Sequence, residues 1–124
     1  MIISIVIPAY NATQTIERTI KSIDLDNNKF RNEVDLEVII IDDGSDDSDS
    51  LKKIIKNYKK IVFLKHRVNK GMCAARNTGI KKSRGSVVII LDSDDEFISN
   101  WLEIFKRIYQ EWPKKTQVCF SQCK

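Results

Sequence analysis

The chain has 124 residues, a formal net charge of +4 and a hydrophobic content of 42%, which is enough apolar material for one ordinary folded core. Lysine and arginine recur along most of the sequence, and no aromatic-and-basic motif accompanies them, so the charge does not indicate a nucleic-acid-binding protein. We therefore expect a single domain over residues 1–124 that has no nucleic-acid partner.

Strand-like and helix-like patterns alternate along the chain. The first is an apolar run over residues 2–7 that Pro8 closes, as in a strand buried on both faces. Helical periodicity follows over residues 13–23, with Asn11 or Thr13 as a candidate N-cap. The later segments that continue the alternation are strands at 36–41, 61–64, 87–91 and 118–120 and helices at 48–58, 72–82 and 101–109.

This alternation predicts an α/β fold with a mostly parallel, open sheet and helices on both faces. In such sheets ligands gather beyond the carboxyl ends of the strands. Three polar segments fall there: residues 8–11 after the first strand, 42–45 after the second and 92–95 after the fourth. The sequence therefore predicts one site built from several loops at a single edge of the sheet.

The segment after the fourth strand is acidic. Asp92, Asp94 and Asp95 follow an apolar run directly, and their mutual repulsion is unfavourable unless a cation lies among them. Carboxylate oxygens suit Mg²⁺ or Mn²⁺, and Mg²⁺ is usually held by one or two carboxylates together with phosphate oxygens. A solvated acidic turn that caps the following helix explains the cluster equally well.

The segment after the second strand allows two interpretations. Gly44 is typical of a turn with a left-handed residue, and Ser45 or Ser48 could cap the next helix. A turn does not require the paired Asp42 and Asp43, whose carboxylates could accept hydrogen bonds from a base ring N–H or from ribose hydroxyls. Taken alone, the segment favours the structural turn.

Basic residues bracket the start of the third helix. Lys70 and Gly71 precede it and Arg76 lies within it, so cations and exposed backbone N–H groups come close to an acidic edge, where they could bind phosphate. The alternative is an ordinary helix with Arg76 in a salt bridge. His66 is expected to be a surface or hydrogen-bonded residue and not a base.

The cysteine content indicates the cellular compartment of the protein. Cys73, Cys119 and Cys123 form no CxxC pair, so we expect neither a zinc site nor a disulfide framework. The apolar start has no basic leader or cleavage site and is too short to span a bilayer. We expect a cytoplasmic protein, and any peripheral association with the inner face of the membrane would use regions outside this sequence.

In their order and spacing these segments resemble the inverting glycosyltransferases with a GT-A fold, often called family 2. The resembling segments are SIVIPAYN (4–11), VIIIDDGS (38–45), NKG (69–71), ARNTGI (75–80), RG (84–85) and LDSDD (91–95). The resemblance implies a Rossmann-like nucleotide-diphospho-sugar transferase fold. It also implies transfer, with inversion, of a sugar from a nucleoside diphosphate, commonly a uridine one, to an acceptor hydroxyl.

The resemblance assigns roles to individual residues. The base ring N–H would bond to Asp43. The candidate ligands of Mn²⁺ or Mg²⁺ would be Asp94 and Asp95, and the resemblance does not decide which of the two is the direct ligand. Asp92, Ser93 and Asp94 match the D-x-D motif of the family. The expected nucleotide-sugar-binding residues are Pro8, Ala9, Tyr10, Asp42, Asp43, Lys70, Gly71, Arg76, Asp92, Ser93 and Asp94.

The family's general base is a carboxylate in the acceptor-binding half that follows the D-x-D motif. Only residues 96–124 follow Asp95 here, and they contain no second acidic motif. We therefore expect a truncated chain: the donor half of a longer enzyme, without the catalytic base and without most of the site for a glycan, lipid-linked or protein acceptor. A nucleotide-binding or assembly module without catalysis is the alternative. A receiver-type signalling domain would need an acidic pair where Pro8, Ala9 and Tyr10 stand.

Overall fold

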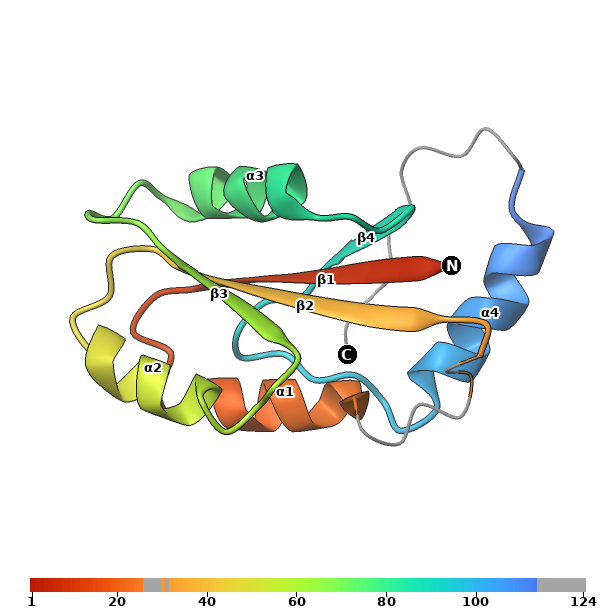
Figure 1. Ribbon diagram of the computed structural model, residues 1–124, viewed down its shortest axis with the longest axis horizontal. Helices are drawn as coiled ribbons and strands as arrows, with labels where there is room; N and C mark the ends of the chain where they lie inside the picture. Colours follow the sequence, from red (N-terminus) through yellow and green to blue (C-terminus); the bar gives the residue numbers. More distant parts are fainter. Residues whose placement is uncertain (26–29, 31, 114–124) are drawn as a thin grey trace.

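The computed structural model describes residues 1–25, 30 and 32–113, and strands and helices alternate along them (Figure 1). The expected strand at 118–120 lies outside the described residues. In chain order the elements are β1 (Ile2–Ala9), α1 (Ile16–Ile23), β2 (Asp35–Asp42), α2 (Ser48–Ile55), β3 (Ile61–Lys65), α3 (Met72–Lys82), β4 (Val87–Ile90) and α4 (Trp101–Glu111).

The described strands form one sheet in the order β3-β2-β1-β4, and every neighbouring pair is parallel. Ala9 pairs with Asp42, and Asp42 pairs with Lys65, so β1, β2 and β3 end at the same edge. The last residue of β4, Ile90, pairs with Val6. The chain after β4 therefore runs beside the end of β1, where the strand order reverses, which is the usual ligand position in an open α/β sheet.

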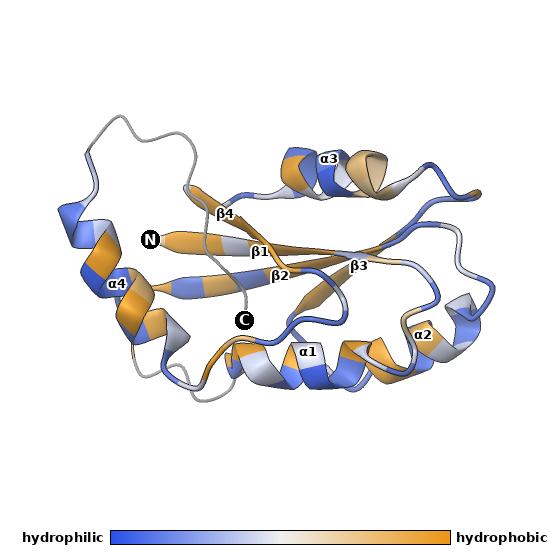
Figure 2. Ribbon diagram, turned by 180° about the vertical axis from the view of Figure 1, so that it is seen from behind, coloured by the Kyte–Doolittle hydropathy of each residue, from blue (hydrophilic) through white to orange (hydrophobic). Residues whose placement is uncertain are grey.

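Helices cover both faces of the sheet, as the alternation predicts. Helices α1 and α2 lie on one face and α3 on the other, while α4 lies near the end at which β1 begins (Figure 1). The strands are the most hydrophobic segments, and the helices carry mixed surfaces (Figure 2). Among the described residues, no helix has the length and apolar character that a bilayer crossing requires.

Alternate side chains of β1 supply two hydrophobic cores. Ile3, Ile5 and Ile7 belong to the larger core, which includes residues of α1 and α2. Val6 belongs to the smaller core on the α3 face. There Gly79 lets α3 approach the sheet closely, because a Cβ atom at this position would lie 2.2 Å from Val6 Cγ1. Burial of both faces of the sheet explains why the strands are continuous apolar runs in the sequence.

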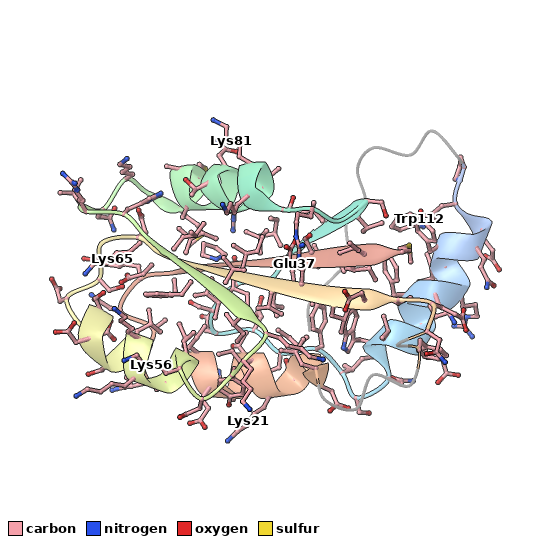
Figure 3. The ribbon with its side chains drawn as sticks, viewed as in Figure 1. Lys21, Glu37, Lys56, Lys65, Lys81 and Trp112 are labelled. Carbon is pink, nitrogen blue, oxygen red and sulfur yellow. The ribbon has the colours of Figure 1, made fainter. Side chains whose placement is uncertain are left out.

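A buried polar network crosses the α3 face near the beginning of the strands. Glu37 accepts hydrogen bonds from the Ser4 hydroxyl at 2.6 Å and from the Arg84 amide and Nε at 2.9 and 2.7 Å. The Gly85 amide donates to Ser4 Oγ at 2.8 Å. Figure 3 labels Glu37, on the side of the sheet that α3 covers. The Arg84-Gly85 segment thus joins α3 to β4 and lies away from the carboxyl edge.

The start of α1 differs from the prediction. The helix begins at Ile16, and its N-cap is Thr15, not Asn11 or Thr13. The Asn11 amide donates to Ser45 Oγ, and the Thr13 amide and hydroxyl donate to the Asp47 carboxylate. These hydrogen bonds join the β1–α1 loop to the β2–α2 loop. Asn11 Oδ1, the atom that would accept at a cap, accepts instead from the Asp46 amide at 2.9 Å, and the Thr13 hydroxyl is bonded to Asp47.

Candidate functional site

The carboxyl edge of the sheet brings together the loops that follow β1, β2, β3 and β4. The Asp43 amide donates to the Ala9 carbonyl at 2.8 Å, and the His66 amide donates to the Asp42 carbonyl at 2.8 Å. The Leu91 amide donates to the Val6 carbonyl at 3.0 Å. These contacts continue the pairing of the strands beyond their ends, so the loops leave the sheet side by side.

Asp43 is the most heavily bonded side chain at this edge. Its Oδ1 accepts from the Lys70 amide at 3.0 Å and lies 2.6 Å from His66 Nδ1, and its Oδ2 accepts from the Gly71 amide at 2.9 Å. Burial raises the pKa of Asp43, but the hydrogen bonds from His66, Lys70 and Gly71 outweigh it and lower the pKa. Asp43 is therefore a carboxylate at neutral pH.

Asp42 points away from that cluster. Its Oδ1 accepts from the Ser45 amide at 3.0 Å and its Oδ2 from the Ser48 hydroxyl, and its side chain is fully buried. Gly44 adopts φ +72°, and a Cβ atom there would lie 2.5 Å from the Asn69 amide nitrogen. Of the two adjacent aspartates, Asp42 stabilises the turn and Asp43 contacts the β3–α3 loop.

His66 is buried and hydrogen-bonded, in agreement with one of the two environments expected for it. Its Nδ1 faces Asp43, and its Nε2 lies 2.9 Å from Thr78 Oγ1 on α3. The contact with Asp43 was missed by sequence reasoning. One signal for it existed: His66 lies two positions past the end of the predicted third strand (61–64), just as Asp43 lies two positions past the end of the predicted second strand (36–41).

Arg76 and Asp92 form an ion pair across the site, with Nη2 2.9 Å from Oδ1 and both side chains about one-third exposed or more. The sequence left open whether Arg76 binds an anion or makes a salt bridge, and the structure shows a salt bridge to the acidic cluster itself. The Nε of Arg76 is buried and has no hydrogen-bond partner among the described residues. The guanidinium thus brings positive charge to the Asp92 end of the acidic loop.

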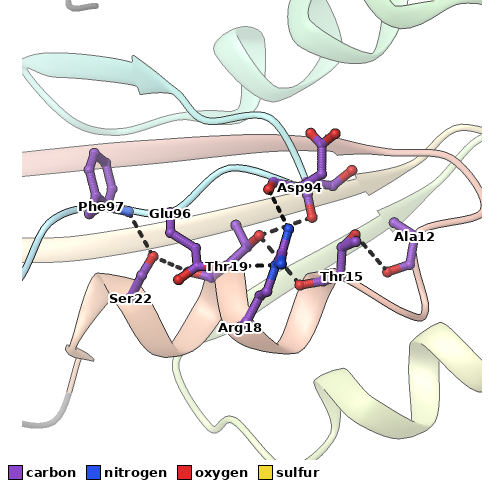
Figure 4. A network of polar contacts seen from close by, with 9 residues as sticks. Ala12, Thr15, Arg18, Thr19, Ser22, Asp94, Glu96 and Phe97 are labelled. Atoms are coloured by element: carbon purple, nitrogen blue, oxygen red, sulfur yellow. Dashed lines mark hydrogen bonds and ion pairs between the residues drawn. The ribbon is translucent and has the colours of Figure 1, made fainter. Parts of the chain in front are cut away.

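Helix α1 holds the backbone of the acidic loop (Figure 4). The Thr19 hydroxyl donates to the Ser93 carbonyl at 2.9 Å, and Arg18 Nη2 donates to the Asp94 carbonyl at 3.0 Å. Thr19 is fully buried. Side chains of one helix therefore fix the main chain that carries the D-x-D motif.

Two further contacts extend this attachment along the loop. The Phe97 amide donates to Ser22 Oγ at 3.0 Å, and Arg18 Nε lies 3.1 Å from a carboxylate oxygen of Glu96. Both pairs are drawn in Figure 4. The loop is thus attached to α1 through main-chain atoms and through Glu96, and none of these attachments uses the carboxylates of Asp94 or Asp95.

The acidic cluster does not cap the next helix. Helix α4 has Asn100 as its N-cap, five positions beyond Asp95, so the helix-cap interpretation of the cluster is wrong. The side chains of Asp94 and Asp95 make no hydrogen bond or ion pair with any residue that the structure describes. No three metal-ligating side chains cluster in residues 1–25, 30 and 32–113. Two carboxylates suit a Mg²⁺ or Mn²⁺ ion that takes its other oxygens from water and phosphate.

The remaining expected residues lie at the carboxyl edge or beside it. Pro8 and Ala9 are buried in β1, whereas the Tyr10 ring is half exposed just beyond the strand. The Lys70 side chain is exposed, and Gly71 adopts φ +91° where its amide turns toward Asp43. Tyr10 and Lys70 therefore offer side chains at the edge, and Pro8, Ala9 and Gly71 contribute main chain.

Comparison with solved structures identifies the fold. S. aureus TarS (residues 1–349) in complex with UDP superposes with a TM-score of 0.74 at 24% identity, over 90% of this chain and 32% of TarS. The mannosyltransferase PcManGT of Pyrobaculum calidifontis, in complex with GDP-Man and Mn²⁺, gives a TM-score of 0.68 at 21% identity, over 81% of this chain and 30% of that one. The sheet and its helices thus have the expected GT-A fold.

Sequence relatives carry glycosyltransferase names. An uncharacterized glycosyltransferase of Rickettsia conorii is 40% identical over 110 residues, which is 88% of this chain and 17% of that protein. The poly(ribitol-phosphate) β-N-acetylglucosaminyltransferase TarP of Staphylococcus aureus is 39% identical over 95 residues, 75% of this chain and 28% of TarP. The chain thus spans less than a third of either relative. A family model described as glycosyl transferase family 2 matches residues 4–120, and the chain belongs to this family.

Proposed function

We propose that this chain is the donor-binding part of a glycosyltransferase that moves a sugar from a nucleoside-diphosphate sugar to an acceptor hydroxyl with inversion. One observation carries the proposal: at a single sheet edge the chain brings together a buried carboxylate, Asp43, the ion pair of Arg76 with Asp92, and two carboxylates without a protein partner among the described residues, Asp94 and Asp95. A base, a diphosphate and a metal ion are the chemical groups that such an edge can bind.

The base-binding part of the proposed site consists of Asp43 and Tyr10, supported by Pro8, Ala9 and the buried Asp42. A carboxylate has about four acceptor positions, and three N–H groups already point at Asp43. The remaining position is suited to the ring N–H of a uracil base. Structures of TarS contain UDP and UDP-GlcNAc, which supports a uridine donor, whereas PcManGT was solved with GDP-Man.

The diphosphate part of the proposed site is mixed in charge. Asp94 and Asp95 would hold Mn²⁺ or Mg²⁺, and Arg76, Lys70 and the Gly71 main chain would lie beside the phosphates or the sugar. A bound divalent ion supplies Lewis-acid neutralisation of the charge that develops on the departing diphosphate. Asp92 and Ser93 would contact the ribose or the sugar. The presence of Mn²⁺ in PcManGT supports a metal-dependent site.

We assign acceptor binding to regions of the related proteins that this sequence does not cover. WfgD of Escherichia coli, 34% identical, is named as a UDP-Glc:α-D-GlcNAc-diphosphoundecaprenol β-1,3-glucosyltransferase, and a Campylobacter jejuni relative, also 34% identical, is named for an undecaprenol-linked acceptor. These names support a glycan or lipid-linked acceptor and a role in cell-surface polysaccharide biosynthesis. We place the reaction in the cytoplasm, at the inner face of the membrane.

The proposed metal ligands can be tested one at a time with Asp94→Asn and Asp95→Asn. Each change removes one negative charge while keeping the side-chain shape. Calorimetric titration with UDP, with and without Mn²⁺, should show that the gain in affinity on adding Mn²⁺ falls about tenfold or more for the variant that loses a direct ligand.

Glu103→Gln is the matched control, because it also neutralises one exposed carboxylate but lies on α4. The control should keep the full effect of Mn²⁺. If both aspartate variants behave like the control, Asp94 and Asp95 are not metal ligands.

A further inference from the structure

His66 connects Asp43 to two regular elements of the fold. The residue follows Lys65 at the end of β3, and its amide donates to the Asp42 carbonyl at 2.8 Å, which fixes its backbone to β2. Its ring is 9% exposed. One ring nitrogen lies 2.6 Å from Asp43 Oδ1 and the other 2.9 Å from Thr78 Oγ1 on α3. The ring therefore bridges the base-binding carboxylate and a helix.

The hydrogen-bonding capacity of the groups determines where the protons lie. Asp43 is ionised and can only accept, so Nδ1 of His66 must carry a proton and donate it. The Thr78 hydroxyl can turn either way: it donates to Nε2 when the ring is neutral and accepts from Nε2–H when the ring is charged. The orientation of His66 against Asp43 is thus preserved in both protonation states of the ring.

The other two hydrogen-bond partners of Asp43 lie in a loop and not in a helix or strand. The Lys70 and Gly71 amides belong to the β3–α3 loop, in which residues 67–70 are exposed. With these two bonds alone, the orientation of the carboxylate would depend on the conformation of this exposed loop. His66 adds a third bond whose other end is held by β2 and α3, and binding groups are most precise when rigid elements support them.

We propose that His66 is a positioning residue for donor recognition: with Thr78 it holds the Asp43 carboxylate in the orientation that accepts a hydrogen bond from the ring N–H of the base. This inference rests on the proposed function, since it takes the ligand to be a uridine nucleotide. His66 does not touch the nucleotide in this arrangement. It acts only through Asp43, so its effect should be confined to recognition of that one N–H group.

The test compares UDP with its N3-methyl analogue, which lacks the ring N–H, by calorimetric titration of the chain in the presence of Mn²⁺. The wild type should bind UDP more tightly than the analogue. His66→Phe keeps a ring in the buried space but cannot donate to Asp43. It should lower the affinity for UDP roughly tenfold and leave the affinity for the analogue unchanged, so that the protein no longer discriminates between the two ligands.

Two further variants separate positioning from folding. His66→Asn retains an N–H donor near the Nδ1 position and should restore most of the discrimination. Thr78→Val keeps the histidine and removes its anchor on α3, so it should lower discrimination about threefold, and it serves as the test if His66→Phe does not fold. Thermal unfolding of each variant identifies those that are folded.

The wild type and the variants answer different questions. A wild type that does not bind UDP contradicts the proposed function and this inference with it. A wild type that binds both nucleotides equally contradicts recognition of the ring N–H by Asp43, and with it this inference, but not donor binding itself. A wild type that discriminates, together with folded His66→Phe or Thr78→Val protein that discriminates equally well, leaves the proposed function standing and overturns the role of His66.

Discussion

Asp43 is the residue that we propose for recognition of the donor base. Asp43→Ala removes the proposed acceptor for the base. It also leaves the Lys70 amide without its partner and the Gly71 amide with Asn69 Oδ1 alone. Hydrogen bonds to a charged group contribute about 1.5–3 kcal/mol, so UDP should bind roughly 10 to 100 times more weakly. Calorimetric titration measures this loss.

Asp46→Ala is the control for that change. Asp46 lies in the same β2–α2 loop, is exposed and bonds only to Asn11 at the rim among the described residues. Its loss should change UDP affinity less than twofold or so, because exposed pairs contribute little. Equal effects of the two substitutions would mean that the segment is a structural turn, as the sequence taken alone favours.

The different hydrogen-bonding roles of Asp42 and Asp43 could not be predicted from the sequence, in which the two residues are adjacent. Both carboxylates follow the same strand, and only the tertiary contacts separate them: Asp42 bonds within its own turn, whereas Asp43 bonds to His66, 23 positions away in sequence. Sequence periodicity carries no information about a partner at that distance. It did place both residues at the correct edge of the sheet, because strand ends are set by local patterns.

At the scale of elements, α1 determines the position of the acidic loop. Thr19→Val removes the hydroxyl that donates to the Ser93 carbonyl and keeps the branched shape of the side chain. Because Thr19 is fully buried, the change should lower the free energy of unfolding by about 1–3 kcal/mol. It should also weaken the effect of Mn²⁺ on UDP affinity, since the loop that carries Asp94 loses a support.

Chemical denaturation and calorimetric titration check these two effects. Ser83→Ala is the control: its hydroxyl donates to the Ile80 carbonyl at the exposed end of α3, and its loss should leave the metal effect intact. A Thr19→Val protein that keeps the full Mn²⁺ effect would show that the loop holds its shape without α1.

Element order was predictable from sequence, and element boundaries were less so. The buried strands and the periodic helices alternate as expected because apolar patterns reflect burial on one or both faces. Helix α1 begins at Ile16, later than the pattern suggests, since Asn11 and Thr13 bond across to the β2–α2 loop. Capping residues indicate a helix start only when no tertiary partner competes for them.

At the scale of the whole molecule, the Ser4–Glu37–Arg84 network should give the fold a dependence on pH. Burial raises the pKa of Glu37, but hydrogen bonds from Ser4 and from the amide and guanidinium of Arg84 outweigh it and lower the pKa below its usual 4.5. A carboxyl whose folded pKa is depressed stabilises the fold above the unfolded pKa, and this contribution is lost as the pH falls through the folded pKa.

Denaturant unfolding measured between pH 7 and pH 3 checks this expectation. Glu37→Gln should reduce stability at neutral pH by about 1–3 kcal/mol, because it replaces a charged acceptor with a neutral one. The variant should lose less stability than the wild type on acidification. Asp43, whose pKa is also lowered, contributes in the same direction in both proteins. Parallel pH profiles for the two proteins would contradict this role of Glu37.

We propose above that the carboxyl edge of this sheet binds a nucleoside diphosphate together with a divalent metal ion. Calorimetric titration of the chain with UDP and with GDP, each with and without Mn²⁺, tests it most directly. UDP should bind more tightly than GDP, and Mn²⁺ should strengthen UDP binding roughly tenfold or more. Absence of nucleotide binding, or the same affinity with and without Mn²⁺, would contradict it.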